Sequence, residues 1–232
     1  MSKGKLEKFA EVAGFPNVLQ PPFGEVFGRD HPLKGRWNTE FFKNEKPITL
    51  ELGCGKGEYT VGLARLYPER NFLGVDIKGA RIWKGAKTAL ESGLRNVGFL
   101  RTRIDFIESF FSANEIHEIW ITFPDPQLKK DLKKLTSSRF LNRYRGFLQV
   151  TGSINLKTDS EELYLYTLDL IRHNQLELLF HTNDLYASDY HDTILSIPTF
   201  YEKMWLEEGK PIRYIKFRLN SEYQISELPD EK

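Results

Sequence analysis

A strand that leads directly into a glycine cluster constrains the fold of this chain more than any other feature. Residues 48–52 predict a short apolar strand, and three glycines lie within the next five positions, 53–57. An apolar spacing typical of a helix follows over 59–66, and a second apolar strand, 71–76, ends in an aspartate. This succession begins an open parallel sheet, in which ligands bind at the carboxyl ends of the strands.

The same alternation of strands and helices continues toward the end of the chain. Helices are predicted at 79–92, 106–111, 137–147 and 160–173, and further strands at 97–100, 117–123, 152–158, 176–182 and 212–219. We therefore expect an α/β fold of the Rossmann-like type. Its sheet is mostly parallel and seven-stranded, with helices on both faces.

The first 46 residues interrupt this regularity because Gly and Pro recur too often for long elements. We expect three parts: an N-terminal arm at 1–46, partly extended with one short helix, a main domain at 47–220, and a tail at 221–232. The arm is either a surface segment whose aromatic side chains pack on the main domain or a segment that helps to hold a substrate. Those aromatic residues are Phe9, Phe15, Phe23, Phe27 and Trp37.

The charge balance is close to zero, with 33 Lys and Arg against 32 Asp and Glu, which does not suggest a nucleic-acid-binding protein. Locally the balance differs, because residues 129–145 hold seven basic residues and one acid, Asp131. The basic residues are Lys129, Lys130, Lys133, Lys134, Arg139, Arg143 and Arg145. This basic stripe is either a solvated helix face or a set of phosphate contacts, and we expect Lys129 and Lys134 to make such contacts.

The single cysteine, Cys54, excludes an intrachain disulfide and any cysteine-rich metal site, and no metal is predicted. The sequence holds no run of about eighteen apolar residues and no apolar signal core near its start. We therefore expect a cytoplasmic protein that does not enter a membrane.

The glycine turn and its neighbouring acids predict a nucleotide-type ligand. Gly53 and Gly55 let the backbone approach a ligand closely, and Asp76 stands at the spacing where an acid meets ribose hydroxyls. A dinucleotide-binding site has Gly or Ala at the last position of its glycine motif, which Glu58 occupies here. Glu51 instead suits a cationic ligand, so S-adenosylmethionine is favoured over NAD. The alternative is a purely structural tight turn with a strand-end acid that caps a helix.

Two further acids follow strand ends. Asp105 follows the third strand of the main domain and is placed either to accept the adenine amino group or to cap the next helix. Asp125 lies in a Phe-Pro-Asp-Pro loop, 123–126, after the fourth strand. Its two prolines stiffen the backbone around one carboxylate. This favours the interpretation that Asp125 is a preorganised carboxylate beside the transferring methyl group; the alternative is a plain proline turn.

These motifs resemble those of the tRNA (guanine-N7-)-methyltransferase family, and they occur in order from about residue 46 to 219. The matching pieces are residues 51–57, 74–76, 123–126, 139–141, 158–159, 199–202 and 209–211. Some positions depart: Gln127 stands where the family usually has Trp, and a denser basic cluster is interrupted by Asp131, Leu132, Leu135 and Thr136.

The resemblance implies a class I S-adenosylmethionine-dependent methyltransferase fold over residues 47–220 and methylation of the variable-loop guanine of tRNA. It implies cofactor contacts from Glu51, Gly53, Gly55, Asp76 and Asp105, and places Asp125 at both the cofactor and the guanine as the catalytic residue. Substrate contacts are implied for Lys129, Asp159, Thr199 and Glu202. The pair Thr199 and Glu202 fits a helix-capping box equally well.

Other functions remain open at this point. They are methyl transfer to another RNA base or a small molecule, a non-catalytic RNA-binding protein on the same fold, and an NAD-dependent oxidoreductase as the weakest. The expected partner is tRNA, with no obligatory protein partner, in a monomer or a homodimer.

Overall fold

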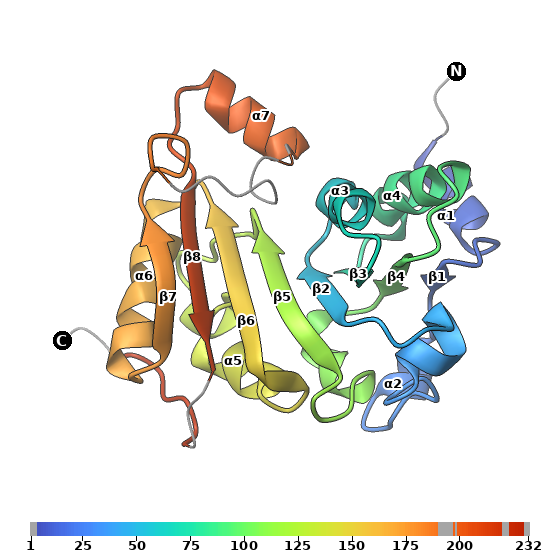
Figure 1. The fold of residues 1–232 in the computed structure, drawn as a ribbon, viewed down its shortest axis with the longest axis horizontal. Helices are drawn as coiled ribbons and strands as arrows, with labels where there is room; N and C mark the ends of the chain where they lie inside the picture. Colours follow the sequence, from blue (N-terminus) through green and yellow to red (C-terminus); the bar gives the residue numbers. More distant parts are fainter. Residues whose placement is uncertain (1–3, 190–196, 198, 220–222, 230–232) are drawn as a thin grey trace.

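The computed structural model describes residues 4–189, 197, 199–219 and 223–229, and it shows one sheet covered by helices on both faces (Figure 1). The described strands are β1 (Val18–Leu19), β2 (Ile48–Leu52), β3 (Asn71–Asp76), β4 (Val97–Arg101), β5 (Ile116–Thr122), β6 (Leu148–Thr158), β7 (Glu177–Thr182) and β8 (Arg213–Arg218). Their order across the sheet is β1-β4-β3-β2-β5-β6-β8-β7. The expected α/β class is confirmed.

Most neighbouring strands run parallel, and β8 alone is antiparallel to its two neighbours, β6 and β7. The expected count of seven strands was wrong by one. The additional strand is β1, in which Val18 and Leu19 pair with Phe99 and Leu100 at the edge of the sheet. A strand of two residues is too short to show an alternation of apolar and polar side chains, so the sequence pattern did not predict β1.

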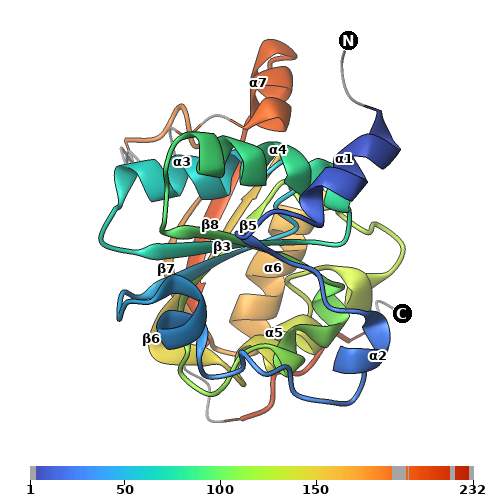
Figure 2. The ribbon, with the colours of Figure 1, turned by 90° about the vertical axis from the view of Figure 1, so that its right-hand side faces the viewer.

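The helices form two layers (Figure 2). One face carries α1 (Lys5–Val12), α3 (Glu58–Leu66) and α4 (Gly79–Glu91), and the other carries α2 (Phe23–Val26), α5 (Ser138–Tyr144) and α6 (Glu161–His173). Helix α7 (Phe200–Glu207) lies beyond the carboxyl ends of the central strands (Figure 1). None of the helices in the described part of the chain is long and apolar enough to span a bilayer.

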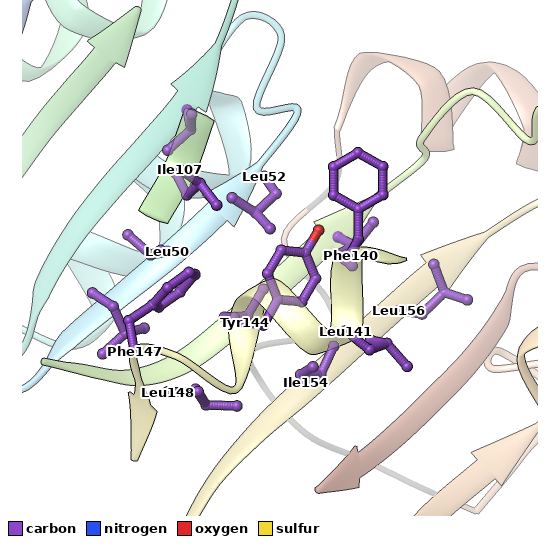
Figure 3. Packing of buried hydrophobic residues seen from close by; sticks show 14 of the residues in the cluster. Leu50, Leu52, Ile107, Phe140, Leu141, Tyr144, Phe147, Leu148, Ile154 and Leu156 are labelled. Carbon is purple, nitrogen blue, oxygen red and sulfur yellow. The ribbon is translucent and has the colours of Figure 1, made fainter. Parts of the chain in front are cut away.

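The alternation of side chains along β2 divides the core between these layers. Leu50 and Leu52 join the cluster beneath α5, where Tyr144 and Phe147 are fully buried (Figure 3). Glu51 lies between them in sequence, so its side chain points to the opposite face, toward α3. Burial on both faces is typical of a parallel sheet covered by helices, and it fixes where the Glu51 carboxylate must lie.

The first 46 residues pack on the main sheet to different degrees. Trp37 begins a π-helical turn (Trp37–Phe42), is fully buried, and donates its indole N–H to the Phe110 carbonyl at 2.8 Å. Helix α1 packs against α4. By contrast, Phe23 and Phe27 are more than half exposed. Both rings nevertheless pack edge-on against the Phe106 ring, with centroids 5.2 and 6.0 Å apart, so the expected packing holds for these two as well as for Trp37, although they stay largely exposed.

Candidate cofactor and substrate site

The glycine turn joins β2 to α3 in a conformation that needs glycine. Gly53, Gly55 and Gly57 have φ angles of 77°, 54° and 68°, all in the left-handed region. The Gly53 amide donates to the Val75 carbonyl at 2.8 Å, and the Gly55 amide donates to Asp76 Oδ2 at 2.9 Å. These two bonds hold the turn against the end of β3.

The three glycines differ in what a side chain would meet. A Cβ on Gly53 would have its nearest neighbour, Leu135 Cδ1, at 3.9 Å, and one on Gly55 would meet only its own turn's backbone at 4.0 Å. A Cβ on Gly57 would collide with the Phe99 ring at 2.5 Å. Gly57 thus allows close packing of α3 on the sheet, whereas Gly53 and Gly55 present open backbone that a ligand can approach.

Glu51 is a buried carboxylate whose two oxygens are both hydrogen bonded. Oε2 accepts the Thr60 amide at 2.8 Å and also the Thr60 hydroxyl, and Oε1 accepts the Thr122 hydroxyl at 2.6 Å. Burial raises the pKa of Glu51 to about 7, and Asp76 adds to this, although the threonine hydrogen bonds oppose the shift. A cation placed beside this carboxylate would stabilise its ionised form.

Asp76 and Asp105 line the same pocket, of about 470 Å³, which we name the Asp76 pocket. Its other lining residues are Gly53, Ile77, Thr102, Arg103, Ile104, Gln127, Lys133, Leu135, Arg139 and Phe140. Asp76 Oδ1 accepts the Lys78 amide at 2.7 Å. The pocket thus brings together one open glycine and two of the predicted acids.

Asp105 is paired with two basic side chains. Its Oδ1 accepts Arg139 Nη2 at 2.6 Å, and Arg103 lies 3.5 Å from Oδ2. Arg143 Nη1 donates to the Asp105 carbonyl at 2.6 Å. The alternative role as a helix cap is not supported, because the following 3₁₀ turn (Ile104–Ser109) has Arg103 at its N-cap and no side-chain cap.

A second, smaller pocket of about 70 Å³ adjoins the first and shares Gly53 with it. We name it the Glu51 pocket; its lining residues are Glu51, Gly53, Cys54, Gly55, Lys56, Glu58, Tyr59, Arg81, Thr122, Phe123 and Thr199. It therefore gathers the buried carboxylate, both open glycines and the predicted substrate residue Thr199.

The Phe-Pro-Asp-Pro loop borders both pockets. Phe123 lines the Glu51 pocket, and Gln127 lines the Asp76 pocket. Both have positive φ, 47° and 49°, although neither is glycine. Asp125 lies between them, exposed and outside both linings, with Oδ1 accepting the Gln127 amide at 3.1 Å. Strain of this kind recurs at binding sites, which favours a functional loop over a plain turn.

Lys129 and Asp159 do not line either pocket. Lys129 is exposed, and Asp159 is half-buried, with its backbone carbonyl accepting Arg213 Nη1 at 2.9 Å. Their predicted substrate contacts stay predictions.

The basic stripe is more neutralised than its sequence suggests. Lys134 is buried, pairs with Asp131 and lies 4.1 Å from the centre of the Tyr166 ring. Arg139 pairs with Asp105, and Arg143 pairs with Glu108. The expectation that Lys134 faces a phosphate was wrong, because its aliphatic stem and ammonium complete an internal contact instead.

Thr199 and Glu202 form the helix-capping box at the start of α7. The Thr199 hydroxyl accepts the Glu202 amide at 3.1 Å, and the Glu202 carboxylate accepts the Thr199 amide at 3.4 Å. Glu202 is also fully buried, 2.5 Å from Lys157 Nζ and bonded to the Tyr186 hydroxyl at 2.8 Å. The capping interpretation is confirmed, and a contact between Glu202 and substrate stays a prediction.

Sequence reasoning missed the residues that hold these groups in place. Thr60 and Thr122 bind Glu51 from a helix and a neighbouring strand, and Lys157 on β6 binds Glu202 on α7. Lys157 lies directly before the strand-end motif at 158–159, but no sequence pattern pairs it with a residue 45 positions later. Tertiary pairs of this kind leave no local signal.

Comparison with known proteins gives consistent results. A family model described as "Putative methyltransferase" matches residues 45–215. A tRNA (guanine-N(7)-)-methyltransferase of Bacteroides thetaiotaomicron is 54% identical over 230 residues, which cover 99% of this chain and 91% of the relative. One of the same description from Clostridium acetobutylicum is 35% identical over 202 residues, covering 86% and 93%.

Solved structures share the fold at low sequence identity. The 16S rRNA methyltransferase KamB has a TM-score of 0.58 and 14% identity, covering 75% of this chain and 87% of its own. An antibiotic-related methyltransferase has a TM-score of 0.56 and 14% identity, covering 83% and 97%. At this identity the likeness concerns the fold alone.

Proposed function

This chain belongs to the tRNA (guanine-N(7)-)-methyltransferase family, and we propose that the Asp76 and Glu51 pockets hold its cofactor, with Asp125 facing the target guanine. The family assignment makes it an S-adenosylmethionine-dependent enzyme acting on N7 of guanine in tRNA. The observation that carries the proposed site is the pair of open glycines, Gly53 and Gly55, between two pockets that contain carboxylates.

The residues present fit this cofactor. Asp76 suits the ribose hydroxyls, Asp105 suits the adenine amino group, and the buried Glu51 suits the positive charge near the methionine end. The raised pKa of Glu51, due to burial, indicates a carboxylate that gains most from a cationic neighbour. When bound, S-adenosylmethionine supplies an electrophilic methyl group on a positively charged sulfur.

Methylation of guanine N7 requires no proton transfer by the protein before the methyl group is attacked. Guanine N7 is a lone-pair acceptor on the major-groove edge and carries no proton, so no general base is required. Catalysis then depends on alignment, with reacting atoms held about 3–3.5 Å apart. The purine becomes cationic during transfer, and a fixed carboxylate nearby favours that change electrostatically.

Asp125 is the carboxylate that we assign to this task. Its neighbours Phe123 and Gln127 line the Glu51 and Asp76 pockets, which supports the proposal that its exposed carboxylate accepts the N1 and N2 hydrogens of guanine. Thr199 in the Glu51 pocket, and Lys129 and Asp159 near the same edge of the sheet, are the proposed further contacts to the tRNA. The proposed target is the guanine of the variable loop.

The deciding experiment is incubation of the protein with methyl-labelled S-adenosylmethionine and unmodified tRNA, followed by nucleoside analysis. We expect label in 7-methylguanosine, and loss of that label when the variable-loop guanine is replaced by adenine. Label in another nucleoside, or label that persists in the adenine-substituted tRNA, would contradict the proposed target.

We further propose that the enzyme works in the cytoplasm, where tRNA is processed, as a monomer or a homodimer without an obligatory protein partner. Both pockets are complete within one chain, which supports catalysis by a single subunit. Sedimentation analysis of the active enzyme, with and without tRNA, tests the oligomeric state.

A further inference from the structure

A basic groove lies beside the proposed site, outside the stripe at 129–145. Helix α1 and the start of α4 enclose a cavity of about 730 Å³ whose lining holds five cationic side chains and no acid. The lining residues are Lys5, Leu6, Lys8, Phe9, Ile77, Lys78, Gly79, Ala80, Arg81 and Arg101. We call this cavity the α1–α4 groove.

The five cations have no carboxylate partner among the described residues. Arg101 lies 4.6 Å from the centre of the Phe9 ring and donates Nε to the Ile77 carbonyl at 3.1 Å, and Lys8 lies over the Trp83 ring. These contacts hold the side chains without neutralising them.

The acids of α1 are engaged away from the groove. The Glu7 carboxylate accepts the Gly4 amide at 2.7 Å, and Glu11 binds the Trp83 indole at 2.8 Å and lies 3.6 Å from Lys87. Within the described part of the chain, the groove thus keeps all five of its positive charges unpaired, whereas three of the seven cations of the basic stripe, Lys134, Arg139 and Arg143, have acidic partners.

The groove shares one lining residue with each pocket of the proposed site. Ile77 lines the groove and the Asp76 pocket, and Arg81 lines the groove and the Glu51 pocket. A polyanion that contacts Thr199 at the rim of the Glu51 pocket therefore comes close to Arg81, which lines the same pocket, and the remaining four cations lie in the groove that Arg81 also lines.

Exposed apolar surface lies among these charges. Leu6 is 85% exposed, Ile77 50% and Phe9 42%, all within the groove lining. Cations interleaved with an accessible aromatic ring suit a nucleic-acid strand, because phosphates pair with the cations and a base or ribose packs on the ring. The geometry points to a phosphate-binding groove that holds the tRNA backbone next to the methylated nucleotide.

The inference rests on the proposed function and assigns α1 a direct part in tRNA binding. The test compares two double variants. The groove variant combines Lys5→Glu and Lys8→Glu, and the control variant combines Lys43→Glu and Arg95→Glu. The control pair is exposed and precedes β2 and β4, so it lies at the amino ends of these parallel strands, opposite the site. Both variants change the net charge equally.

We expect the Lys5 and Lys8 variant to bind tRNA at least tenfold more weakly than the wild type in about 0.1 M salt. The slope of log affinity against log salt concentration should fall by about 1.4–1.8, since each lost phosphate contact removes about 0.7–0.9. Its affinity for S-adenosylmethionine and its single-turnover rate at saturating tRNA should remain those of the wild type. The control should keep the wild-type slope.

Because charge reversal on α1 can also loosen that helix, Lys78→Gln at the start of α4 serves as a second variant, with an expected slope change of about 0.7–0.9. Wild-type tRNA affinity and slope in both groove variants would overturn the inference, as would an equal loss in the control pair. A wild-type enzyme that binds tRNA through the groove without forming 7-methylguanosine would instead contradict the proposed function alone.

Discussion

At the residue scale, Glu51 is the buried carboxylate that we propose pairs with the positive charge of the cofactor. Its oxygens are held by Thr60 and Thr122, and its pKa is raised to about 7 by burial. Near neutral pH, the Glu51 carboxyl group is therefore protonated in a substantial fraction of the ligand-free protein molecules. If the cationic cofactor binds beside Glu51 as we propose, it displaces that proton, and cofactor affinity is then coupled to pH through this residue.

We predict that binding of S-adenosylmethionine releases close to one proton per site at pH 6 and almost none at pH 8.5. Calorimetry in buffers of different ionisation enthalpy measures this number. Glu51→Gln should abolish the release and weaken cofactor binding. Absence of proton release from the wild type at pH 6 would show that Glu51 is already ionised.

The same shift predicts how stability depends on pH. A carboxyl whose folded pKa lies above its unfolded value contributes stability that is fully present below about pH 4.5 and is lost as the pH rises through about 7. The free energy of unfolding of the wild type should thus fall relative to Glu51→Gln by up to about 3 kcal/mol between pH 5 and 8. Urea unfolding of the ligand-free proteins at both pH values tests this.

Asp125 offers a different case, because its carboxylate is exposed and, within the described part of the chain, accepts one hydrogen bond, from the Gln127 amide. We predict that Asp125→Ala changes the free energy of unfolding by less than about 0.5 kcal/mol and lowers single-turnover methyl transfer by at least tenfold. Cofactor affinity, measured by calorimetry, should change much less. Asp125→Asn keeps the shape and removes the charge, so equal losses in both variants indicate electrostatic action. Unchanged turnover in Asp125→Ala would exclude the assigned role.

At the scale of elements, α7 is joined to the sheet by a buried ion pair. Lys157 on β6 and Glu202 on α7 are both fully buried, with nitrogen and oxygen 2.5 Å apart. Burial lowers the pKa of Lys157, and Glu202 opposes that change. Since Glu202 also caps α7 together with Thr199, the pair fixes the end of the helix that reaches the Glu51 pocket.

We predict that Lys157→Met destabilises the protein by about 3–5 kcal/mol, because it leaves the Glu202 charge buried without a cation to neutralise it. The double variant Lys157→Met with Glu202→Gln should regain part of that loss. Lys210→Met is the matched control, since Lys210 forms an exposed pair with Glu208 at 3.0 Å, and its loss should amount to less than about 1 kcal/mol. Denaturant unfolding measures all three, and a Lys157→Met protein as stable as the control would contradict the prediction.

Element boundaries illustrate what a local pattern can and cannot give. Most predicted helices and strands end within one or two residues of the observed ends, because apolar periodicity and glycine mark them. Strand β6 is an exception: it was expected from residue 152 and begins at Leu148. The pairing with β5 shifts between Ile116 and Glu118, and Gly152 lies in that irregular part, so a glycine that suggested a strand start marks a bulge.

At the scale of the whole molecule, the N-terminal residues are part of the packed structure. Trp37 is fully buried in the main hydrophobic cluster and donates its indole N–H to Phe110. We predict that Trp37→Ala lowers the free energy of unfolding by about 3–5 kcal/mol. Phe27→Ala, at a ring that is 61% exposed, should cause a much smaller loss. Equal losses in the two variants, measured by urea unfolding, would contradict this distinction.

The near-zero net charge also acquires a meaning only in three dimensions. Acids gather at the carboxyl ends of the strands, with Glu51, Asp76 and Asp105 lining two adjoining pockets. Beside them lies the α1–α4 groove, lined by five cations and no acid. Under the two proposals, the acids face a cationic cofactor and the cations face an anionic RNA, so both kinds of charge lie at one edge of the sheet.

By itself the sequence determined the α/β fold, the glycine turn, the position of Asp76 at its strand end and the family. These features are local, since strand and helix periodicity and glycine conformation depend on near neighbours. Only the tertiary structure decided that Lys134 is buried, that Arg139 pairs with Asp105, and that Lys157 pairs with Glu202. Charge pairing depends on distance in space, and a sequence gives the charges without those distances.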